Sequence, residues 1–251
     1  MKLEHQVAII TGSTGIGAAT AQAFARAGAK LAVVGRSQDH LEQLRLELPD
    51  MLPIVIDLVE GGAAKTVVER TLEHFGRLDV LVNIAGISGR KYGDGPVHEA
   101  TDAGWDTVMD TNAKTTFSLC REALEPMMKQ GSGSIVNMAS VLAYAPNPEF
   151  FATHAYAACN GARIALTKSM AAYYAKYGIR VNAVAPGLIA TPMSERAQTD
   201  IAILKYLETR QPITGLPGTS QDVAEGILYL ATSPFITGVI LEIAGGWSVA
   251  G

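Results

Sequence analysis

Short apolar segments alternate with longer segments whose apolar residues recur at helical spacing, from the start of the chain to its end. The short segments are rich in Val, Ile and Leu and are apolar almost throughout, which is typical of strands buried on both faces of a sheet. Seven strands are predicted, over Val7–Thr11, Leu31–Val34, Ile54–Ile56, Val80–Asn83, Ser134–Ala139, Val181–Val184 and Val239–Ile243. Helices are predicted after Gly17 to about Ala27, and over Gln38–Leu48, Ala63–Phe75, Asp102–Lys129, Ala155–Lys176 and Thr219–Ala231.

This alternation of strands and helices predicts repeated βαβ units. The expected fold class is α/β, a doubly wound seven-stranded parallel sheet with helices on both faces, the Rossmann fold. In such a sheet a ligand crevice lies at the carboxyl ends of the strands, where the winding reverses. No Pro/Ser-rich linker, charge run or repeat divides the chain, so we expect a single domain over residues 1–251.

A glycine-rich turn joins the first strand to the first helix, with the sequence Thr11-Gly12-Ser13-Thr14-Gly15-Ile16-Gly17. Glycine lets the backbone approach a pyrophosphate, and the helix N-terminus offers free N–H groups and the positive end of its dipole. A glycine cluster alone also serves tight turns, but its place between a strand and a helix favours dinucleotide binding. The sequence therefore predicts cofactor contacts from Gly12 through Gly17.

Segments along the whole chain resemble the short-chain dehydrogenase/reductase family. The glycine turn resembles that family's Thr-Gly-x-x-x-Gly-Ile-Gly loop, Asn83-Ile84-Ala85-Gly86 its Asn-Asn-Ala-Gly motif, and Ser140 with Tyr156 its catalytic pair. The resemblance implies that Asp57 and Leu58 meet the adenine ring, and that a loop starting at Pro186-Gly187 flanks the nicotinamide. The further cofactor-binding residues that it implies are Asn83, Ala85, Gly86, Tyr156, Asn160, Ile189 and Thr191. It makes the chain a dinucleotide-binding domain whose substrate loop spans about 188–218.

The residues after the second strand, Gly35-Arg36-Ser37, bear on which dinucleotide is bound. An acid at this position accepts from the 2′-hydroxyl of NAD, whereas a nearby Arg accommodates the 2′-phosphate of NADP. Here the acid is absent, Gly35 leaves room, and Arg36 is a planar donor suited to phosphate, to which Ser37 adds a hydroxyl. NADP(H) is therefore favoured. NAD(H) stays possible, since an exposed Arg36 could also stack on adenine.

The same resemblance implies a catalytic set. In the family a tyrosine acts as acid and base, a serine hydrogen-bonds the substrate oxygen, and a lysine one turn after the tyrosine lowers its pKa and holds the nicotinamide ribose. Asn112, Ser140 and Tyr156 match the family's asparagine, serine and tyrosine, but Asn160 stands where the lysine belongs. Tyrosine has an ordinary pKa of about 10, and a neutral amide cannot supply the charge that lowers it. Asn160 could still donate a hydrogen bond to ribose or hold a water molecule.

Two cations follow on the same predicted helix, Arg163 and Lys168. Arg163 lies seven residues after Tyr156, on nearly the same helix face, and helical side chains lean toward the N-terminus. A long guanidinium could therefore reach back toward Tyr156, whereas Lys168 is too distant. The stronger expectation is that Arg163 pairs at a subunit interface or reaches solvent.

The chain departs from the family in its loops as well. Two residues, not three, separate Gly12 from Gly15, which moves backbone donors by about 3–4 Å unless the strand end or the helix start compensates. Pyrophosphate contacts could therefore be rearranged, or the register could slip within the turn at little cost. The segment from Asn147 to Phe151 is expected to form an apolar loop beside the substrate pocket, and His154 to be a packing or loop residue.

Composition and charge argue against several other functions. The net charge is −4 and basic residues are scattered, so no patch suited to nucleic acid is expected. No apolar run reaches the ~18 residues of a membrane helix, and the N-terminus lacks a signal-peptide pattern. Cys120 and Cys159 have no metal-type neighbours, so no metal site is expected, and two cysteines suit a reducing cytoplasm better than a disulfide framework.

Together these features predict an NADP(H)-preferring short-chain oxidoreductase that interconverts a ketone and a secondary alcohol, with activity impaired by Asn160. The alternative is a catalytically inactive dinucleotide-binding protein that serves as a binding or assembly module. A lyase or epimerase that uses Tyr156 without hydride transfer has no specific support. The resemblance implies a homotetramer, and the apolar segment Ile240–Trp247 suits burial against a partner as well as within one subunit.

Overall fold

One parallel sheet runs through the protein, and the computed structural model describes it within residues 3–250. The strands are β1 (Val7–Thr11), β2 (Lys30–Gly35), β3 (Leu52–Val55), β4 (Val80–Asn83), β5 (Gly133–Met138), β6 (Ile179–Pro186) and β7 (Ile240–Ile243). They are ordered β3-β2-β1-β4-β5-β6-β7, and every neighbouring pair is parallel. The winding reverses at β1, which lies between β2 and β4, so the predicted doubly wound α/β fold is confirmed.

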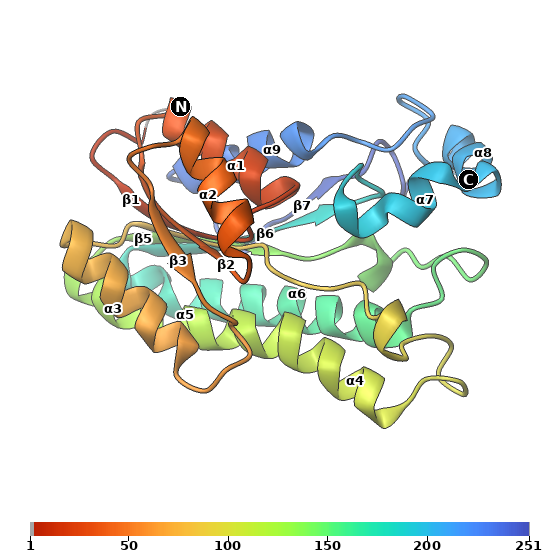
Figure 1. Cartoon of the computed structure of the whole chain (residues 1–251), viewed down its shortest axis with the longest axis horizontal. Helices are drawn as coiled ribbons and strands as arrows, with labels where there is room; N and C mark the ends of the chain where they lie inside the picture. The colour runs from red at the N-terminus through yellow and green to blue at the C-terminus, as the bar shows by residue number, and fades with distance from the viewer. Residues whose placement is uncertain (1–2, 251) are drawn as a thin grey trace.

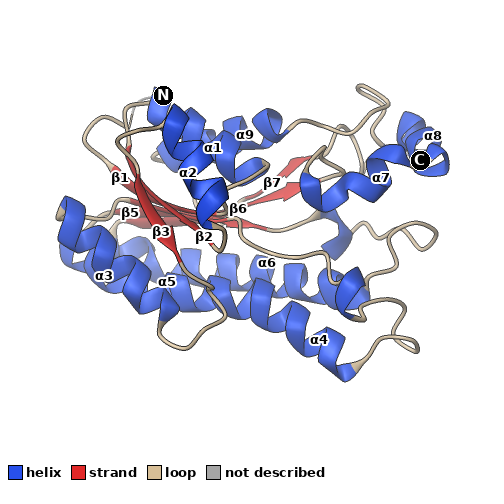
Figure 2. Ribbon diagram, viewed as in Figure 1, coloured by secondary structure: helices blue, strands red, loops and turns tan. Residues whose placement is uncertain are grey.

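Helices cover both faces of the sheet, as Figures 1 and 2 show. On one face lie α1 (Ile16–Arg26), α2 (Gln38–Glu47) and α9 (Ser220–Thr232). On the other lie α3 (Ala63–Phe75), α4 (Asp102–Val108), α5 (Thr115–Gln130) and α6 (His154–Tyr174). Two short helices, α7 (Glu195–Thr199) and α8 (Ile201–Arg210), lie beyond one end of the sheet.

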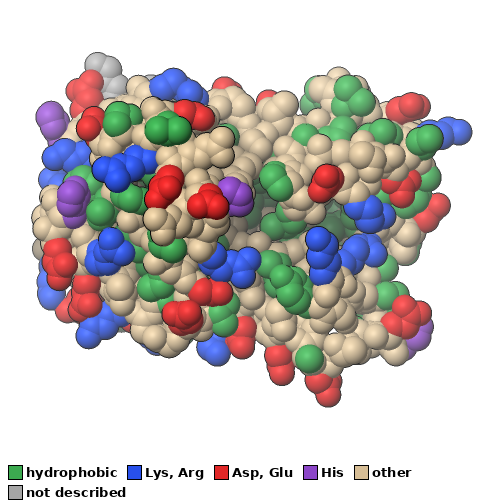
Figure 3. Space-filling view, in the orientation of Figure 1, with side chains coloured by type: hydrophobic (Ala, Val, Ile, Leu, Met, Phe, Trp, Pro, Cys, Tyr) green, Lys and Arg blue, Asp and Glu red, His purple; other side chains and the backbone are tan. Residues whose placement is uncertain are grey.

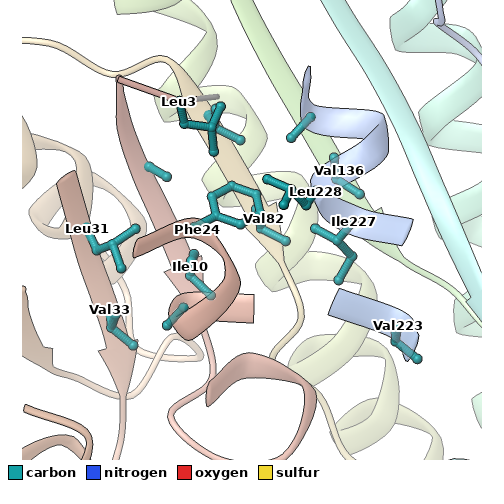
Figure 4. Close-up of a cluster of buried hydrophobic side chains, with 14 of the residues drawn as sticks. Leu3, Ile10, Phe24, Leu31, Val33, Val82, Val136, Val223, Ile227 and Leu228 are labelled. Atoms are coloured by element: carbon teal, nitrogen blue, oxygen red, sulfur yellow. The ribbon is translucent and has the colours of Figure 1, made fainter. Parts of the chain in front are cut away.

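Alternate residues of the central strands supply the two halves of the core. Ile10 of β1, Val82 of β4 and Val136 of β5 pack with Phe24 and Ile227 of the helices on one face (Figure 4). Their neighbours Ile9, Leu81 and Ile135 pack in a second cluster with helices of the other face. Burial of both sets explains why the strands are apolar almost throughout, and it holds the carboxyl ends of β1, β4 and β5 together.

The helix predicted over Asp102–Lys129 is wrong in one respect, because a π-helical stretch, Met109–Lys114, separates α4 from α5. Such turns hold one more residue than an α-helical turn and occur often at functional sites. Here the wide turn presents Asn112 inward, where its Oδ1 accepts from the Ile87 nitrogen at 2.9 Å and its Nδ2 donates to the Ile87 oxygen at 3.1 Å. The other predicted strands and helices end within two residues of those found.

The segment expected to be a substrate loop, about 188–218, contains α7 and α8. Asp200 begins α8, since its carboxylate accepts from the backbone nitrogens of Ala202 and Ile203. The loop is anchored by Gln211, whose Oε1 accepts from the Leu188 nitrogen at 2.6 Å and whose Nε2 donates to the Leu216 oxygen at 2.9 Å. This buried amide therefore ties both ends of the loop together.

Candidate active site

The glycine turn closes between β1 and α1 despite its missing residue. Gly12 and Gly15 take φ angles of 104° and 52°, which side chains other than glycine rarely adopt. A Cβ on Gly17 would collide with the carbonyl oxygen of Gly12, so this position also requires glycine. No side chain caps α1; the nitrogens of Gly17 and Ala18 donate to the Thr14 oxygen within the turn, and the positive end of the helix dipole lies at this edge.

A cavity of about 330 Å³ lies beside this turn and brings together most of the residues expected to hold the adenine end. Its lining includes Gly12, Ser13, Thr14, Arg36, Ser37, Asp57, Leu58, Ala85 and Gly86. Nη1 of Arg36 lies 3.7 Å from Oδ2 of Asp57, and both side chains are partly exposed. The space expected beside Gly35 is filled, because an ideal Cβ there would lie 2.7 Å from Oγ of Ser13. Gly35 therefore lets Ser13 of the turn pack against β2.

The loop after β4 is oriented by a threonine of β1. The Thr11 hydroxyl accepts from the nitrogens of Ile84 and Ala85 at 2.9 and 3.0 Å. Ala85 and Gly86 line the cavities, but Asn83 does not. Its side chain is buried beneath them, where Nδ2 donates to Oδ1 of Asn137 at 2.9 Å. Asn83 thus joins β4 to β5 inside the sheet.

A second cavity of about 400 Å³ adjoins the first and shares Thr14, Gly86 and Ile87 with it. Its lining includes Gly15, Ile16, Asn112, Ser140, Tyr156, Pro186, Gly187, Ile189 and Thr191. These residues come from the ends of β1, β4, β5 and β6, from the π-helical turn and from α6, as expected where the winding reverses. Two adjoining cavities along a glycine turn give room for an extended ligand such as a dinucleotide.

An aspartate that sequence reasoning missed fixes Tyr156. The carboxylate of Asp94 accepts from the backbone nitrogens of Ala155 and Tyr156 at 3.0 and 2.9 Å, and so caps α6. Asp94 stands in a glycine-rich loop, and nothing in the local sequence links it to a helix that begins 60 residues later. His154 is the first residue of α6 and lies outside the cavity lining; its Nδ1 accepts from the Val97 nitrogen at 3.0 Å, so it packs against the preceding loop.

Asn160 does not point to the cavity. It is fully buried at 0% exposure, and its Nδ2 donates to the backbone oxygen of Tyr156 on its own helix at 2.9 Å. Its Oδ1 is buried without a hydrogen-bond partner among the described residues. The amide is therefore turned back on α6, and its nitrogen is already engaged.

The expectation that Arg163 reaches solvent is wrong. Its side chain is 3% exposed and lines the larger cavity. Nε donates to the Asn112 oxygen and to Oγ1 of Thr116, both at 3.0 Å, and Nη2 donates to the Ala85 oxygen at 3.0 Å. The physical reason is the lean of helical side chains toward the N-terminus, which carries the guanidinium back along α6 beneath the site.

The surroundings of Tyr156 act on its pKa in opposite directions. Burial, and to a lesser degree the neighbouring Cys159, raises the pKa of Tyr156. The positive charge of Arg163 lowers it, as do the side chains of Ser140 and Asn160. Ser140 Oγ accepts from the Leu142 nitrogen at 3.3 Å, which leaves its hydroxyl hydrogen to donate into the cavity.

Apolar and basic side chains share the outer part of this cavity. Phe151 and Trp247 pack with their ring centres 5.9 Å apart, and Nε1 of Trp247 donates to the Ala145 oxygen at 3.0 Å. Arg90, Lys91 and Arg196 complete the lining near the surface. Figure 3 shows a hollow on this face with apolar side chains inside and Lys or Arg side chains around it. Phe151 thus borders the cavity, as expected for the loop that contains it.

The described residues contain no group of three or more His, Cys, Asp or Glu side chains arranged to hold a metal ion. No helix within residues 3–250 has the length and apolar character that crossing a membrane requires.

Comparisons with known proteins show which family the chain belongs to. The family profile described as "Enoyl-(Acyl carrier protein) reductase" matches residues 10–248. The 3-oxoacyl-(acyl-carrier-protein) reductase FabG of Thermotoga maritima is 38% identical over an alignment that covers 98% of this chain and 99% of that protein. The 2-(R)-hydroxypropyl-CoM dehydrogenase of Xanthobacter autotrophicus is 35% identical, with 97% and 98% covered.

Comparison with solved structures indicates the same family. The structure of levodione reductase superposes with a TM-score of 0.91 at 31% identity, over 100% of both chains. That of gox2181 superposes with a TM-score of 0.93 at 28% identity, over 99% of this chain and 97% of the other. The chain belongs to the short-chain dehydrogenase/reductase family of NAD(P)-dependent oxidoreductases.

Proposed function

We propose that this protein is an NADP(H)-preferring oxidoreductase that interconverts a ketone and a secondary alcohol. The observation that carries the proposal is the meeting of Ser140 and Tyr156 in a cavity that continues past Gly86 to the glycine turn. A hydroxyl donor and an acid lie there beside the expected nicotinamide end. Two of the relatives above are named as reductases, of a 3-oxoacyl group and of levodione, and a third as a 2-(R)-hydroxypropyl-CoM dehydrogenase, which supports the same reaction class.

The chain's own residues would carry out the proton chemistry. Bound NADPH would supply a hydride for carbonyl reduction. Ser140 donates a hydrogen bond to the carbonyl oxygen and Tyr156 gives that oxygen a proton as negative charge develops on it. In the opposite direction the Tyr156 phenolate takes the proton of the alcohol. Phe151, Trp247 and their apolar neighbours keep water away from the reacting atoms.

The preference for NADP(H) rests on Arg36. No acid follows β2 to accept from a ribose 2′-hydroxyl, and Arg36 lines the cavity beside the glycine turn. Within residues 3–250 one carboxylate lies within 4 Å of its guanidinium, that of Asp57 at 3.7 Å and partly in solvent, so that weak contact can yield to a phosphate.

Asn160 argues for weakened catalysis. It brings no charge, its nitrogen is bonded to its own helix, and it does not line the cavity. On that ground alone the hydride-transfer step is slower than in a site with lysine at this position. The second candidate function, a dinucleotide-binding module without turnover, rests on the same observation.

The substrate class is suggested by the outer cavity. Arg90 and Arg196 both donate to the Phe150 carbonyl oxygen, at 2.7 and 3.4 Å, which holds two like charges side by side. Nη1 of Arg196 lies 3.7 Å from a carboxylate oxygen of Asp200, and Arg90 feels the negative charge of Asp94. An apolar wall with cations at its outer end suits a carbonyl compound whose far end is anionic.

The deciding experiment measures NADPH binding and NADPH oxidation separately. Kd for NADPH and for NADH is obtained by fluorescence titration, and turnover is measured across a panel of ketones with and without a terminal carboxylate or phosphate. We expect turnover that Tyr156→Phe abolishes while NADPH binding is retained. Tight NADPH binding with no turnover on any ketone would instead support the module without catalysis.

A further inference from the structure

Arg163 is the only lysine or arginine within residues 3–250 that is buried. It spans three elements, since its bonds reach the π-helical turn at Asn112, the start of α5 at Thr116 and the loop after β4 at Ala85. All three acceptors are neutral oxygens. Burying a charge is costly unless a counter-charge or a full set of hydrogen bonds compensates it, so this position calls for an explanation.

No carboxylate in the described part of the chain pairs with Arg163. The carboxylate that caps α6, Asp94, accepts from the backbone nitrogens of Ala155 and Tyr156 with its two oxygens. The titratable neighbours of the guanidinium are Tyr156, Cys159 and Cys120. Burial raises the pKa of Cys120 to about 12 and that of Cys159 to about 11, so both thiols are neutral near pH 7. Tyr156 is then the one neighbour whose ionisation the reaction itself requires.

The third guanidinium nitrogen faces the cavity. Nη1 lies 3.7 Å from the place where a Cβ on Gly86 would stand, and it makes no hydrogen bond with the described residues. Gly86 and Arg163 both line the larger cavity. One N–H group of a buried cation is therefore left for an acceptor in the cavity, on the side where Gly86 borders the adjoining nucleotide cavity.

Helix geometry relates Arg163 to the vacant lysine position. Residues four and seven after Tyr156 lie on one face of α6, and the long Arg163 side chain leans back toward the N-terminus. Asn160, which is shorter, stays against its own helix and leaves Oδ1 unpartnered. Asn160 and Arg163 are complementary, because the positive charge that is absent at position 160 is present one helical turn later, at Arg163, and lies at the same site.

We propose that Arg163 supplies the positive charge of this active site, in place of a lysine at position 160. As a positioning residue it stabilises the phenolate of Tyr156 during alcohol oxidation and holds Asn112 and the Ala85 loop around it. Its free Nη1 offers a hydrogen bond to the hydroxyl groups of a ribose beside Gly86. This inference rests on the proposed function. It predicts a faster turnover than a site that has Asn160 and no other cation beside Tyr156.

The test compares Arg163→Met with Arg163→Lys, which retains charge, and with Thr116→Val, which removes one bracing bond and no charge. The readout is the pH dependence of kcat/KM for alcohol oxidation. We expect the inflection of Arg163→Met to move up by at least one pH unit, which is about tenfold in rate at neutral pH. Arg163→Lys and Thr116→Val should keep the inflection of the parent. Equal inflections in Arg163→Met and the parent would overturn the proposal.

A measurement without cofactor provides independent evidence. Phenolate absorbance is titrated in each protein and in its Tyr156→Phe counterpart, and the difference reports the pKa of Tyr156. We expect that pKa to be higher in Arg163→Met than in the parent and Arg163→Lys. If Arg163→Met does not fold, Arg163→Gln at lower temperature replaces it, and an unchanged Tyr156 titration again contradicts the proposal.

Adding the lysine separates this inference from the proposed function. If Arg163 is the working cation, Asn160→Lys alone places a second charge beside it and gains little, whereas Asn160→Lys with Arg163→Met restores activity. A tenfold or larger gain from Asn160→Lys alone would overturn the role of Arg163 and leave the oxidoreductase intact. Binding of NADPH with no turnover in any variant would overturn the proposed function itself.

Discussion

Oδ2 of Asp94 accepts a hydrogen bond 2.9 Å long from the backbone nitrogen of Tyr156, 62 residues further along the chain. With Oδ1 on Ala155, the carboxylate sets where α6 begins and so where the Tyr156 ring enters the cavity. Replacement by Ala should lower the free energy of unfolding by about 0.5–2 kcal/mol, the range of lost helix caps. Turnover should fall more than NADPH affinity.

Thermal unfolding and steady-state kinetics of Asp94→Ala check this prediction. Asp94→Asn is the matched control, because its amide oxygen can still accept one of the two bonds and should retain part of the stability. Full activity in Asp94→Ala would show that α6 holds Tyr156 in place without the cap.

The pH dependence of the two directions should differ. Burial raises the pKa of Tyr156, so the neutral form prevails near pH 7. Alcohol oxidation needs the phenolate, so its rate should rise about tenfold per pH unit below that pKa, while carbonyl reduction needs the neutral form and should stay level. Initial rates in both directions from pH 6 to 10 test this. A pH-independent oxidation rate would contradict it.

Arg36 should control nucleotide choice. A charge-assisted hydrogen bond contributes roughly 1.5–3 kcal/mol, so Arg36→Ala should weaken NADPH binding about 10- to 100-fold and leave NADH binding little changed. Fluorescence titrations with both nucleotides measure this. Arg45→Ala on α2 serves as control, since Arg45 is exposed and lines neither cavity. An equal loss of affinity for NADPH and NADH would instead indicate that Arg36 stacks on the adenine ring.

Arg196 should influence KM more than kcat. It lines the cavity and is exposed, so Arg196→Gln should raise KM several-fold for a ketone with a terminal carboxylate and leave a neutral ketone unaffected. Lys205→Gln on α8 is the matched control, because Lys205 is exposed and outside the cavity. No difference between the two ketones would remove the case for an anionic substrate.

Both cysteines should be unreactive in the folded protein. Burial raises the pKa of Cys120 to about 12 and of Cys159 to about 11, and only the thiolate reacts readily. A thiol reagent such as DTNB at pH 8 should therefore titrate neither in the native protein and both in urea. Rapid labelling of Cys159 in the native protein would mean that α6 opens near Tyr156.

The sheet was predictable because a strand buried on both faces must be apolar at successive positions, as Ile9 and Ile10 are. Most residues that line the cavities were predictable, because they lie at the carboxyl ends of the strands and match motifs of the family. The position of Arg163 was predicted wrongly because two of its three acceptors are backbone oxygens, of Asn112 and Ala85, and a backbone carbonyl has no sequence signature. Asp94 was missed for the same reason, since it bonds to backbone nitrogens.

The π-helical stretch Met109–Lys114 limits the deletions that the sequence can tolerate. Deleting one residue there would let the segment return to an ordinary α-helix, and every side chain on α4 would turn by about 100° relative to α5. Asn112 would then leave both Ile87 and Arg163, although no side chain in the cavity had been substituted. Length, as much as residue identity, is constrained at this point of the chain.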